Sequence, residues 1–526
     1  MSRFASLGAV DCAPPSAGGR TRDAVLVGSL AFAVSVIGAG RPSLWYDEAA
    51  TLSAATRSPG ELWALLGNED AVHGLYYWLL RGWFIVFPAT EFWARVPSAL
   101  AVGVAAAGVV VLGRQLSVRS VGVAAGVVFA VLPRTTWAGV DARPYALTIA
   151  CAVWVTVLFV VAVERRRIGL WVAYAAALAA ATLVNVIVVL VVAAHAVMVA
   201  GMPTSRRTTA AWLAAMAAAT AAVVPFAATL AQQQDQIGWI WPISVVTLGQ
   251  IAGEQYFPSV YSAGLRAVGP DQQQLTFEQL SLAVQAWARV APLIVVVVAL
   301  GVAAVLMRAR TTEVLGGRPR LLMRAAAAWI LLPTAVLIAY SLIGRPVYQP
   351  HYLSFTTPAL AMLIGVSVVV VGRDARRIGI ILAVLGVAAA PNYVAQRGPY
   401  AKFGSDYSQV VDLVSTRAAP GDCLVVEDSG SPTMVDAVAS ALEGADGLRD
   451  VGRDRSAVEL QSLFGSRLPV SASADTLRTC SVLWTVTARR SEVPGEAEVC
   501  RIAADLGFRR VERWQLNQTQ VVRSVR

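Results

Sequence analysis

Residues 41–52, Arg-Pro-Ser-Leu-Trp-Tyr-Asp-Glu-Ala-Ala-Thr-Leu, follow directly on an uncharged apolar segment at residues 24–40. Two adjacent carboxylates, Asp47 and Glu48, therefore lie a few residues from a hydrocarbon boundary, beside the aromatic side chain of Trp45. Charged side chains are costly at the edge of a membrane, so this pair indicates a functional site. The alternative interpretation is an acidic interfacial loop without a catalytic role.

The composition is that of a membrane protein. The 526 residues are 56% hydrophobic and only 14% charged, and the mean hydropathy is +0.60, far from the average for soluble domains. The formal net charge of +10 comes almost wholly from arginine, because Lys402 is the only lysine. The arginines form short runs between apolar segments, a pattern that sets membrane topology and argues against nucleic-acid binding.

Hydropathy and length predict a polytopic protein with about eleven transmembrane helices. The predicted spans cover residues 24–40, 96–112, 121–132, 146–163, two short spans within 170–202, 210–230, 290–307, 325–343, 355–372 and 378–391. Every arginine-rich link between them falls on one side, which the positive-inside rule makes cytoplasmic. We therefore expect a multi-pass protein of the plasma membrane with a cytoplasmic tail at residues 1–23. Residues 41–93 and the long loop 231–288 then lie on the outer side.

Two short helices are predicted next to the acidic pair. Residues 58–61, Ser-Pro-Gly-Glu, combine an N-cap, a first-turn proline and a capping-box glutamate, which predicts a helix lying in the membrane interface. Residues 73–87 are apolar and aromatic but are about half as long as a full span. They are expected to form a second interfacial or re-entrant helix.

Residues 392–526 have the composition of a soluble domain, and an odd number of spans places them on the extracytoplasmic side. The pattern predicts a small α/β domain with helices at 406–418, 431–442 and 497–506, strands at 420–426 and 481–488, and a hairpin at 509–525. No catalytic motif lies in this segment.

The five cysteines have neither a CxxC pair nor the spacing of metal ligands. They are Cys12, Cys151, Cys423, Cys480 and Cys500. We expect at most one disulfide, near the C-terminus, with Cys480 and Cys500 as the suggested pair.

Several polar groups converge on the outer side in this topology. They are Asp47, Glu48, His73, Asp141, Arg143, His351 and Tyr352. Each has a simpler interpretation, such as a helix cap, an Asp141–Arg143 ion pair or a solvated loop. Together they fit transfer of a group from a lipid-anchored phosphate. A carboxylate deprotonates the acceptor hydroxyl, and arginine stabilises the departing phosphate. Asp47 is then the base, Arg143 the first phosphate ligand and Arg95 the second.

Five segments resemble the GT-C membrane glycosyltransferases, in the branch that includes protein O-mannosyltransferases and the lipid A aminoarabinose transferase. They are Trp-Tyr-Asp-Glu-Ala at 45–49, His-Gly-Leu-Tyr-Tyr at 73–77, Arg-Val-Pro-Ser at 95–98, Asp-Ala-Arg-Pro-Tyr at 141–145 and Gln-Pro-His-Tyr-Leu at 349–353. The resemblance covers roughly residues 24–391, which we expect to form the transmembrane catalytic domain. Two departures are His73-Gly74-Leu75 in place of His-Pro-Pro, and His351 in place of the usual arginine before tyrosine.

The resemblance implies an inverting transfer of a sugar, with mannose the first choice, from a polyprenyl-phosphate donor to an envelope glycan, glycolipid or protein. It implies Asp47 as base with Glu48 in support. Donor-phosphate contacts are expected from Arg143, Arg95, His351 and Tyr352, and substrate contacts from His73, Asp141, Tyr145 and Glu254. No cofactor is certain. Some relatives use a divalent metal, and Asp47 with Asp141 can ligate one.

Two other classes of protein need polar groups beside a membrane. A lipid-linked sugar flippase or transporter would show charges distributed through its spans and symmetry between its halves, and the sequence shows neither. A non-catalytic envelope scaffold would use the C-terminal domain to recruit a partner.

Overall fold

The computed structural model describes residues 17–258, 301, 317–427, 437–439, 441–442, 447–488 and 498–526. Four sequence predictions lie wholly or mostly outside these ranges. They are the tail at 1–23, the span at 290–307, the second part of the loop 231–288 and the helix at 431–442.

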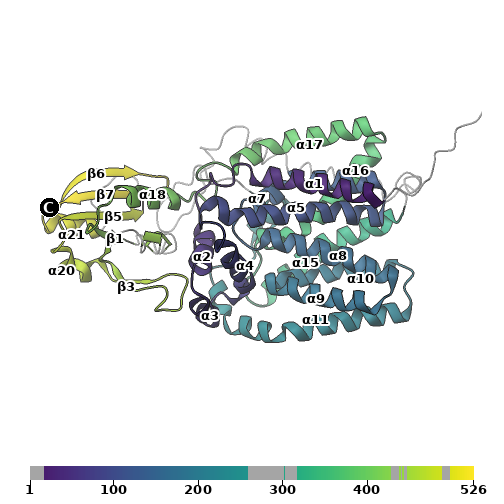
Figure 1. Cartoon of the computed structure of the whole chain (residues 1–526), viewed down its shortest axis with the longest axis horizontal. Helices are drawn as coiled ribbons and strands as arrows, with labels where there is room; N and C mark the ends of the chain where they lie inside the picture. Colours follow the sequence, from purple (N-terminus) through teal and green to yellow (C-terminus); the bar gives the residue numbers. More distant parts are fainter. Residues whose placement is uncertain are drawn as a thin grey trace, which may run out of the picture.

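The larger part of the chain is a bundle of apolar helices. These are α1 (Ala17–Val36), α5 (Glu91–Leu116), α6 (Arg119–Val131), α7 (Pro133–Gly139), α8 (Tyr145–Arg165), α9 (Ile168–Val184), η2 (Val186–Val191), α10 (Val192–Gly201), α11 (Arg206–Gln232), α15 (Pro319–Ile343), α16 (Thr357–Gly372) and α17 (Ala375–Ala395). Figure 1 shows them running along the long axis of the molecule, with α17 and α11 on opposite sides. Each predicted span that lies in the described ranges overlaps one of these helices.

Length and apolar composition alone allow six of the described helices to cross a membrane, or seven if the bent pair α6 and α7 counts as one span. Helix α1 has 20 residues, of which three, Arg20, Arg22 and Asp23, are charged. The other remaining helices are shorter than the roughly 20 residues that a span needs. For example, α6 has 13 residues and α9 has 17. The protein is a multi-pass membrane protein, and its fold is mostly helical.

Small residues bring neighbouring helices close together. A Cβ atom added to Gly28 of α1 would lie 2.9 Å from the carbonyl oxygen of Gly103 in α5, and one added to Gly113 would lie 2.6 Å from Gly122 of α6. Glycine at such positions lets helix backbones approach closely, which is how helices associate when lipid removes the hydrophobic driving force.

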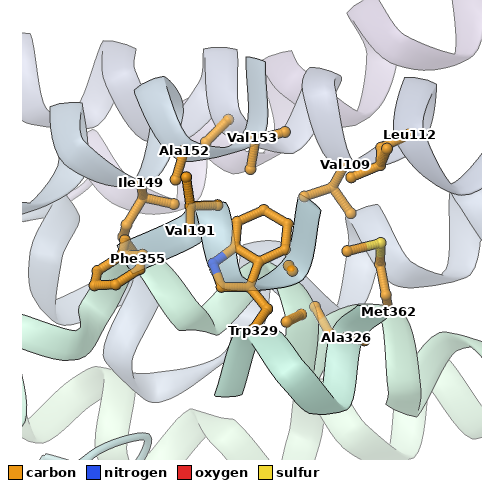
Figure 2. Packing of buried hydrophobic residues seen from close by; sticks show 14 of the residues in the cluster. Val109, Leu112, Ile149, Ala152, Val153, Val191, Ala326, Trp329, Phe355 and Met362 are labelled. Atoms are coloured by element: carbon orange, nitrogen blue, oxygen red, sulfur yellow. The ribbon is translucent and has the colours of Figure 1, made fainter. Parts of the chain in front are cut away.

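Large apolar side chains fill the centre of the bundle. Trp329 of α15 is fully buried among residues from five other segments, as Figure 2 shows. The labelled neighbours from these segments are Val109, Leu112, Ile149, Ala152, Val153, Val191, Phe355 and Met362. This packing joins α5 to α15 and α16, which begin more than 200 residues after α5 ends.

Short helices lie across one end of the bundle. They are α2 (Tyr46–Ala55), α3 (Pro59–Asn68), η1 (Ala71–His73) and α4 (Gly74–Phe84), and Figure 1 shows α2, α3 and α4 between the bundle and the C-terminal domain. The predicted capping box is present, because the Ser58 side chain accepts from the Glu61 N–H while Glu61 accepts from the Ser58 N–H. Four further short helical segments are η3 (Gln234–Ile237), α12 (Val245–Gly249), η4 (Gln250–Glu254) and η7 (Pro350–Thr356).

The C-terminal part is a small α/β domain. Its five-stranded sheet has the order β2-β1-β5-β7-β6. The strands are β1 (Cys423–Val426), β2 (Arg449–Asp450), β5 (Val482–Ala488), β6 (Arg509–Gln515) and β7 (Thr519–Val525), and β3 (Arg453–Arg455) pairs separately with β4 (Ser466–Arg467). Strand β1 is parallel to β2 and β5, whereas β7 is antiparallel to β5 and β6. Helices α18 (Tyr407–Arg417), α20 (Ala474–Leu477) and α21 (Glu498–Asp505) complete the described elements, with η8 at Val470–Ser473.

The disulfide joins Cys423 to Cys480, with their Cα atoms 6.0 Å apart, and Cys500 is a free thiol in α21. The predicted pairing of Cys480 with Cys500 is therefore wrong. Cys423 begins β1, and Cys480 lies just before β5, the strand that pairs with β1. Strand pairing brings these two residues together across a sequence separation of 57, which local spacing does not reveal.

We expect the double variant Cys423→Ser/Cys480→Ser to lower the free energy of unfolding of the C-terminal domain by about 2 to 4 kcal/mol, because the disulfide closes a long loop in the unfolded chain. Limited proteolysis of this domain during a thermal ramp measures the change. Cys500→Ser is the matched control and should leave the transition in place. Equal transitions for both variants would show that the disulfide adds no stability.

Candidate active site

Helix α2 begins at the acidic pair. Trp45 occupies the N-cap position with an extended backbone, and Asp47 and Glu48 lie in the first turn, where a helix favours negative charge. Successive helical residues point in different directions. Glu48 is fully buried, whereas the Asp47 side chain is 24% exposed. The two neighbouring carboxylates therefore occupy different environments.

Glu48 forms a buried two-pronged ion pair with Arg95 of α5. Arg95 Nε donates to Glu48 Oε1 at 2.7 Å, and Arg95 Nη2 donates to Oε2 at 2.6 Å. The backbone N–H of Ala142 also donates to Glu48 Oε1, at 2.8 Å. These charge-assisted bonds tie α2 to α5 and to the loop before α8.

The rest of the Arg95 guanidinium binds main-chain carbonyls. Nη1 donates to Ala39 at 2.7 Å and to Pro42 at 2.8 Å, and Nη2 donates to Ser43 at 3.1 Å. An arginine has five N–H donors, and all five are used here. This geometry favours a positioning role for Arg95 over the phosphate contact that the sequence predicts.

Asp47 faces Arg143, which lies in the loop before α8. Arg143 Nε is 3.6 Å from Asp47 Oδ2. Its Nη1 donates to the Asp47 carbonyl, the Thr51 hydroxyl and the Tyr77 hydroxyl, each at 3.2 Å, and its Nη2 lies 2.5 Å from His73 Nε2. Arg143 Nε has no hydrogen-bond partner within the described ranges. Unlike Arg95, Arg143 retains a donor for an anion beside the Asp47 carboxylate.

The carboxylate of Asp70 is linked to Arg143 through Tyr77 and His73. The Tyr77 hydroxyl donates to Asp70, and His73 Nε2 is 3.9 Å from Asp70 Oδ1. Burial and the nearby Arg143 cation lower the pKa of His73 well below its usual value, so neutral His73 accepts from Arg143. Asp70 is not among the site residues predicted from the sequence. Asp70 has a left-handed backbone with a φ of 56°, and this feature cannot be read from the sequence.

Burial raises the pKa of Asp70 to about 6, against the lowering effect of Arg143. The folded protein therefore holds the Asp70 proton up to a higher pH than the unfolded chain, whose value is near 3.8. The contribution of Asp70 to stability is present at low pH and is lost as the pH rises through about 6. Between pH 4.5 and 7.5, wild type should lose about 2 kcal/mol relative to Asp70→Asn.

Unfolding free energies of the two proteins at both pH values give this difference. Asp475→Asn is the control, because Asp475 is 91% exposed. A difference between wild type and Asp70→Asn that does not change with pH would contradict the prediction.

Asp141 is fully buried and pairs with Lys402. Asp141 Oδ1 accepts from Trp45 Nε1 and from Lys402 Nζ, each at 2.9 Å, and the ammonium lies 4.4 Å from the Trp137 ring centroid. The simpler interpretation of Asp141 as the ion-pair partner of Arg143 is not what the structure shows. Lys402 was missed as a site residue, although a single lysine shortly after the last span is a visible signal.

Tyr145, His351 and Tyr352 form one aromatic group. The His351 ring lies 5.1 Å from Tyr145, 4.7 Å from Tyr352 and 5.9 Å from Trp137, measured between ring centroids. Trp137 also contacts Lys402, so this group adjoins Asp141. The phosphate and substrate roles expected for the three residues stay predictions.

Glu254 is linked to Trp137 through Arg134. Arg134 Nη2 donates to the Glu254 carbonyl, and its guanidinium carbon is 4.9 Å from the Trp137 ring centroid. Segment 254–256 is thereby attached to α7. A substrate contact by Glu254 stays a prediction.

The described side chains do not fit the metal considered from the sequence. No three His, Cys, Asp or Glu side chains in the described ranges are placed to share one ion. Asp141 has an ammonium group as its cationic partner. No step of the reaction below uses a metal.

The helical membrane bundle with a small C-terminal α/β domain is the fold class that the sequence predicts. Residues 74–232 match the family model described as dolichyl-phosphate-mannose-protein mannosyltransferase. This range begins at Gly74, directly after His73, and includes Arg95, Asp141 and Arg143. The comparison with curated proteins gives no match.

Solved structures to which this chain is similar include the following three. ArnT from Cupriavidus metallidurans is 14% identical, with 96% of this chain and 98% of that chain covered and a TM-score of 0.47. The Archaeoglobus fulgidus oligosaccharyltransferase is 12% identical, with 90% and 69% covered and a TM-score of 0.46. The arabinofuranosyltransferase AftD from Mycobacteria is 16% identical, with 96% and 41% covered and a TM-score of 0.49.

Proposed function

We propose that the protein transfers a sugar from a polyprenyl-phosphate donor to a hydroxyl group of an envelope acceptor, with inversion at the anomeric carbon. The observation that supports this most directly is the Asp47–Arg143 pair, in which a partly exposed carboxylate lies 3.6 Å from a guanidinium Nε without a hydrogen bond. A base and an anion ligand side by side are what displacement of a phosphate by a hydroxyl requires.

In this reaction Asp47 accepts the proton of the acceptor hydroxyl. The acceptor oxygen forms a bond to the anomeric carbon while the bond from that carbon to the phosphate oxygen breaks. The electron pair of the broken bond leaves with the polyprenyl phosphate, and Arg143 stabilises the resulting negative charge. Glu48 and Arg95 hold the first turn of α2 in place without entering the chemistry.

The environment of Asp47 suits a base. Burial raises the pKa of Asp47, and the Arg143 cation opposes this rise. A raised pKa makes the carboxylate a better proton acceptor, and the opposing cation keeps it ionised to a lower pH. Transfer is therefore expected to fall on acidification as Asp47 becomes protonated.

The description of the matching family supports mannose as the transferred sugar. The arginine-rich links support an N-terminus in the cytoplasm and the C-terminal domain outside the plasma membrane. The Cys423–Cys480 disulfide supports the same side, because disulfides persist in oxidising compartments. We infer that the acceptor, whether glycan, glycolipid or protein, arrives from the aqueous side next to α2.

The test uses purified protein in lipid nanodiscs with polyprenyl phosphate carrying labelled mannose, and in parallel labelled arabinose, with envelope glycan, glycolipid and protein fractions as acceptors. We expect label in one acceptor fraction together with free polyprenyl phosphate. An inactive wild type in every combination would overturn the proposal. Movement of the labelled lipid across vesicle bilayers without transfer would favour a flippase.

A further inference from the structure

We propose that the C-terminal domain completes the active site, and that Lys402 is the positioning residue through which it does so. The inference rests on the proposed function and adds to it a role for the C-terminal domain. Three independent sets of contacts between this domain and α2 with its neighbours support it.

The first set is the ion pair of Lys402. This residue lies between α17 and α18, at the entrance to the C-terminal domain, and is 1% exposed at its side chain. Its Nζ donates to Asp141, and the adjacent Phe403 ring lies 4.7 Å from Trp45. A charge buried this deeply needs its partner, so the Lys402–Asp141 pair fixes where the segment enters the site.

The position of Asp141 determines where the other residues of its loop lie in the site. Its loop presents the Ala142 N–H to Glu48 and the Arg143 guanidinium to Asp47. The Ser98 hydroxyl supports the same loop by donating to the Asp141 carbonyl at 2.6 Å. Displacement of Asp141 would therefore move both Ala142, which binds Glu48, and Arg143, which faces Asp47.

The second set is a hydrophobic core shared between α2 and the domain. Buried residues before and within α2 belong to one cluster with buried residues of α18, β1, β5 and β7. Those on the α2 side are Leu44, Ala49 and Ala50, and those of the domain include Tyr407, Val410, Leu424, Trp484 and Val521. The Tyr46 and Phe464 rings also lie 5.0 Å apart. The domain thus packs directly on the helix that holds Asp47.

The third set binds segment 461–464 to α2 and α3. The Glu69 carboxylate accepts from the Ser462 hydroxyl at 2.7 Å and from the Leu463 N–H. The Ser53 hydroxyl of α2 donates to the Leu463 carbonyl at 2.6 Å, and Asn68 donates to the Gln461 carbonyl at 3.0 Å. This segment lies far from Lys402 in sequence, so the domain is attached at two separate places.

Helix α2 has only ten residues, so it is too short to be stable alone. It is held on the bundle side by Glu48 and on the other side by the C-terminal domain. Loss of the Lys402 contact should let α2 and loop 141–143 depart from the geometry that transfer requires. A displacement of about 1 Å at a reacting group is enough to lower a rate about 100-fold.

The experiment compares full-length Lys402→Met, Lys402→Arg and Arg467→Met with wild type. Arg467 pairs with Asp450 inside the C-terminal domain and is the matched control for loss of a cation. Transfer kinetics with polyprenyl-phosphate mannose are measured together with hydrogen exchange of peptides from α2 and β5. We expect Lys402→Met to lower kcat about 10- to 100-fold, with the KM for the donor changed less than about twofold. Lys402→Arg should recover much of the loss, and Arg467→Met should match wild type.

Hydrogen exchange separates positioning from general instability. In Lys402→Met, exchange should increase in α2 while β5 stays protected as in wild type. Equal increases in both peptides, or an unchanged kcat and unchanged α2 exchange, would overturn the inference. If wild type transfers no sugar, the proposed function fails, and the α2 exchange still decides whether Lys402 positions this helix. If Lys402→Met does not fold, Lys402→Met/Asp141→Asn takes its place, because it removes both charges of the buried pair. The same fall in kcat and rise in α2 exchange are then expected, and wild-type values for both would overturn the inference.

Discussion

Asp47→Asn is expected to lower kcat for sugar transfer by about 10²- to 10⁴-fold, the usual contribution of a general base. Asparagine keeps the size of the side chain but cannot take the proton of the acceptor hydroxyl at neutral pH. The fold should survive, because Asp47 is partly exposed and the Glu48–Arg95 pair remains in place. The KM for the donor should change much less than kcat, since the proposed phosphate ligand, Arg143, is unchanged.

Initial rates with labelled polyprenyl-phosphate mannose give kcat and KM, and a size-exclusion profile reports the fold. Glu61→Gln is the matched control: it makes the same isosteric change in the neighbouring helix α3, where glutamine can also serve a capping box. Unimpaired transfer by a folded Asp47→Asn protein would rule out Asp47 as the base.

The second large effect concerns stability. Arg95→Met should lower the free energy of unfolding by about 3 to 5 kcal/mol, because it leaves Glu48 charged and buried without its partner. Three backbone carbonyls also lose their donors, namely those of Ala39, Pro42 and Ser43. The loss of transfer in this variant should follow from loss of folded protein.

Unfolding of detergent-solubilised protein, followed by thermal ramp, measures this effect. Arg95→Met/Glu48→Gln removes both charges and should be more stable than Arg95→Met alone. Arg345→Met is the surface control, because Arg345 and Asp235 are 52% and 91% exposed, and should change stability by less than about 1 kcal/mol. A single Arg95→Met variant as stable as this control would contradict a structural role for Arg95.

The two carboxylates of the acidic pair thus differ in their surroundings although they are adjacent in sequence. Glu48 has a bidentate arginine and a backbone N–H, and no part of it is exposed. Asp47 is partly exposed and faces an arginine that retains a donor. The separation follows from the helix, which turns successive side chains by about 100° and so directs one into the bundle and the other toward its edge.

The helical membrane fold, the two short helices after the acidic pair and the α/β character of the C-terminal domain could all be predicted from the sequence. These features depend on local information, such as the apolar length of a span, the capping box at residues 58–61 and the alternation in the hairpin at 509–525. The residues Asp47, Asp141 and Arg143 could also be selected, because charged groups beside apolar segments are few.

The partners of those residues depended on tertiary structure. Sequence spacing suggested Asp141 with Arg143 and Cys480 with Cys500, whereas the fold pairs Asp141 with Lys402 and Cys480 with Cys423. Lys402 lies 261 residues from Asp141 along the chain. Pairing over such separations is set by how helices and strands pack, and no local pattern records it.

The amino-acid sequence by itself determined which segments enter the membrane and which acidic and basic residues gather at one end of them, because hydration free energy acts residue by residue. Only the tertiary structure decided that Arg95 is saturated by Glu48 and carbonyls while Arg143 keeps a donor beside Asp47. The physical reason is that hydrogen-bond capacity is shared among all the groups that packing brings within reach, and this sharing exists only in the folded chain.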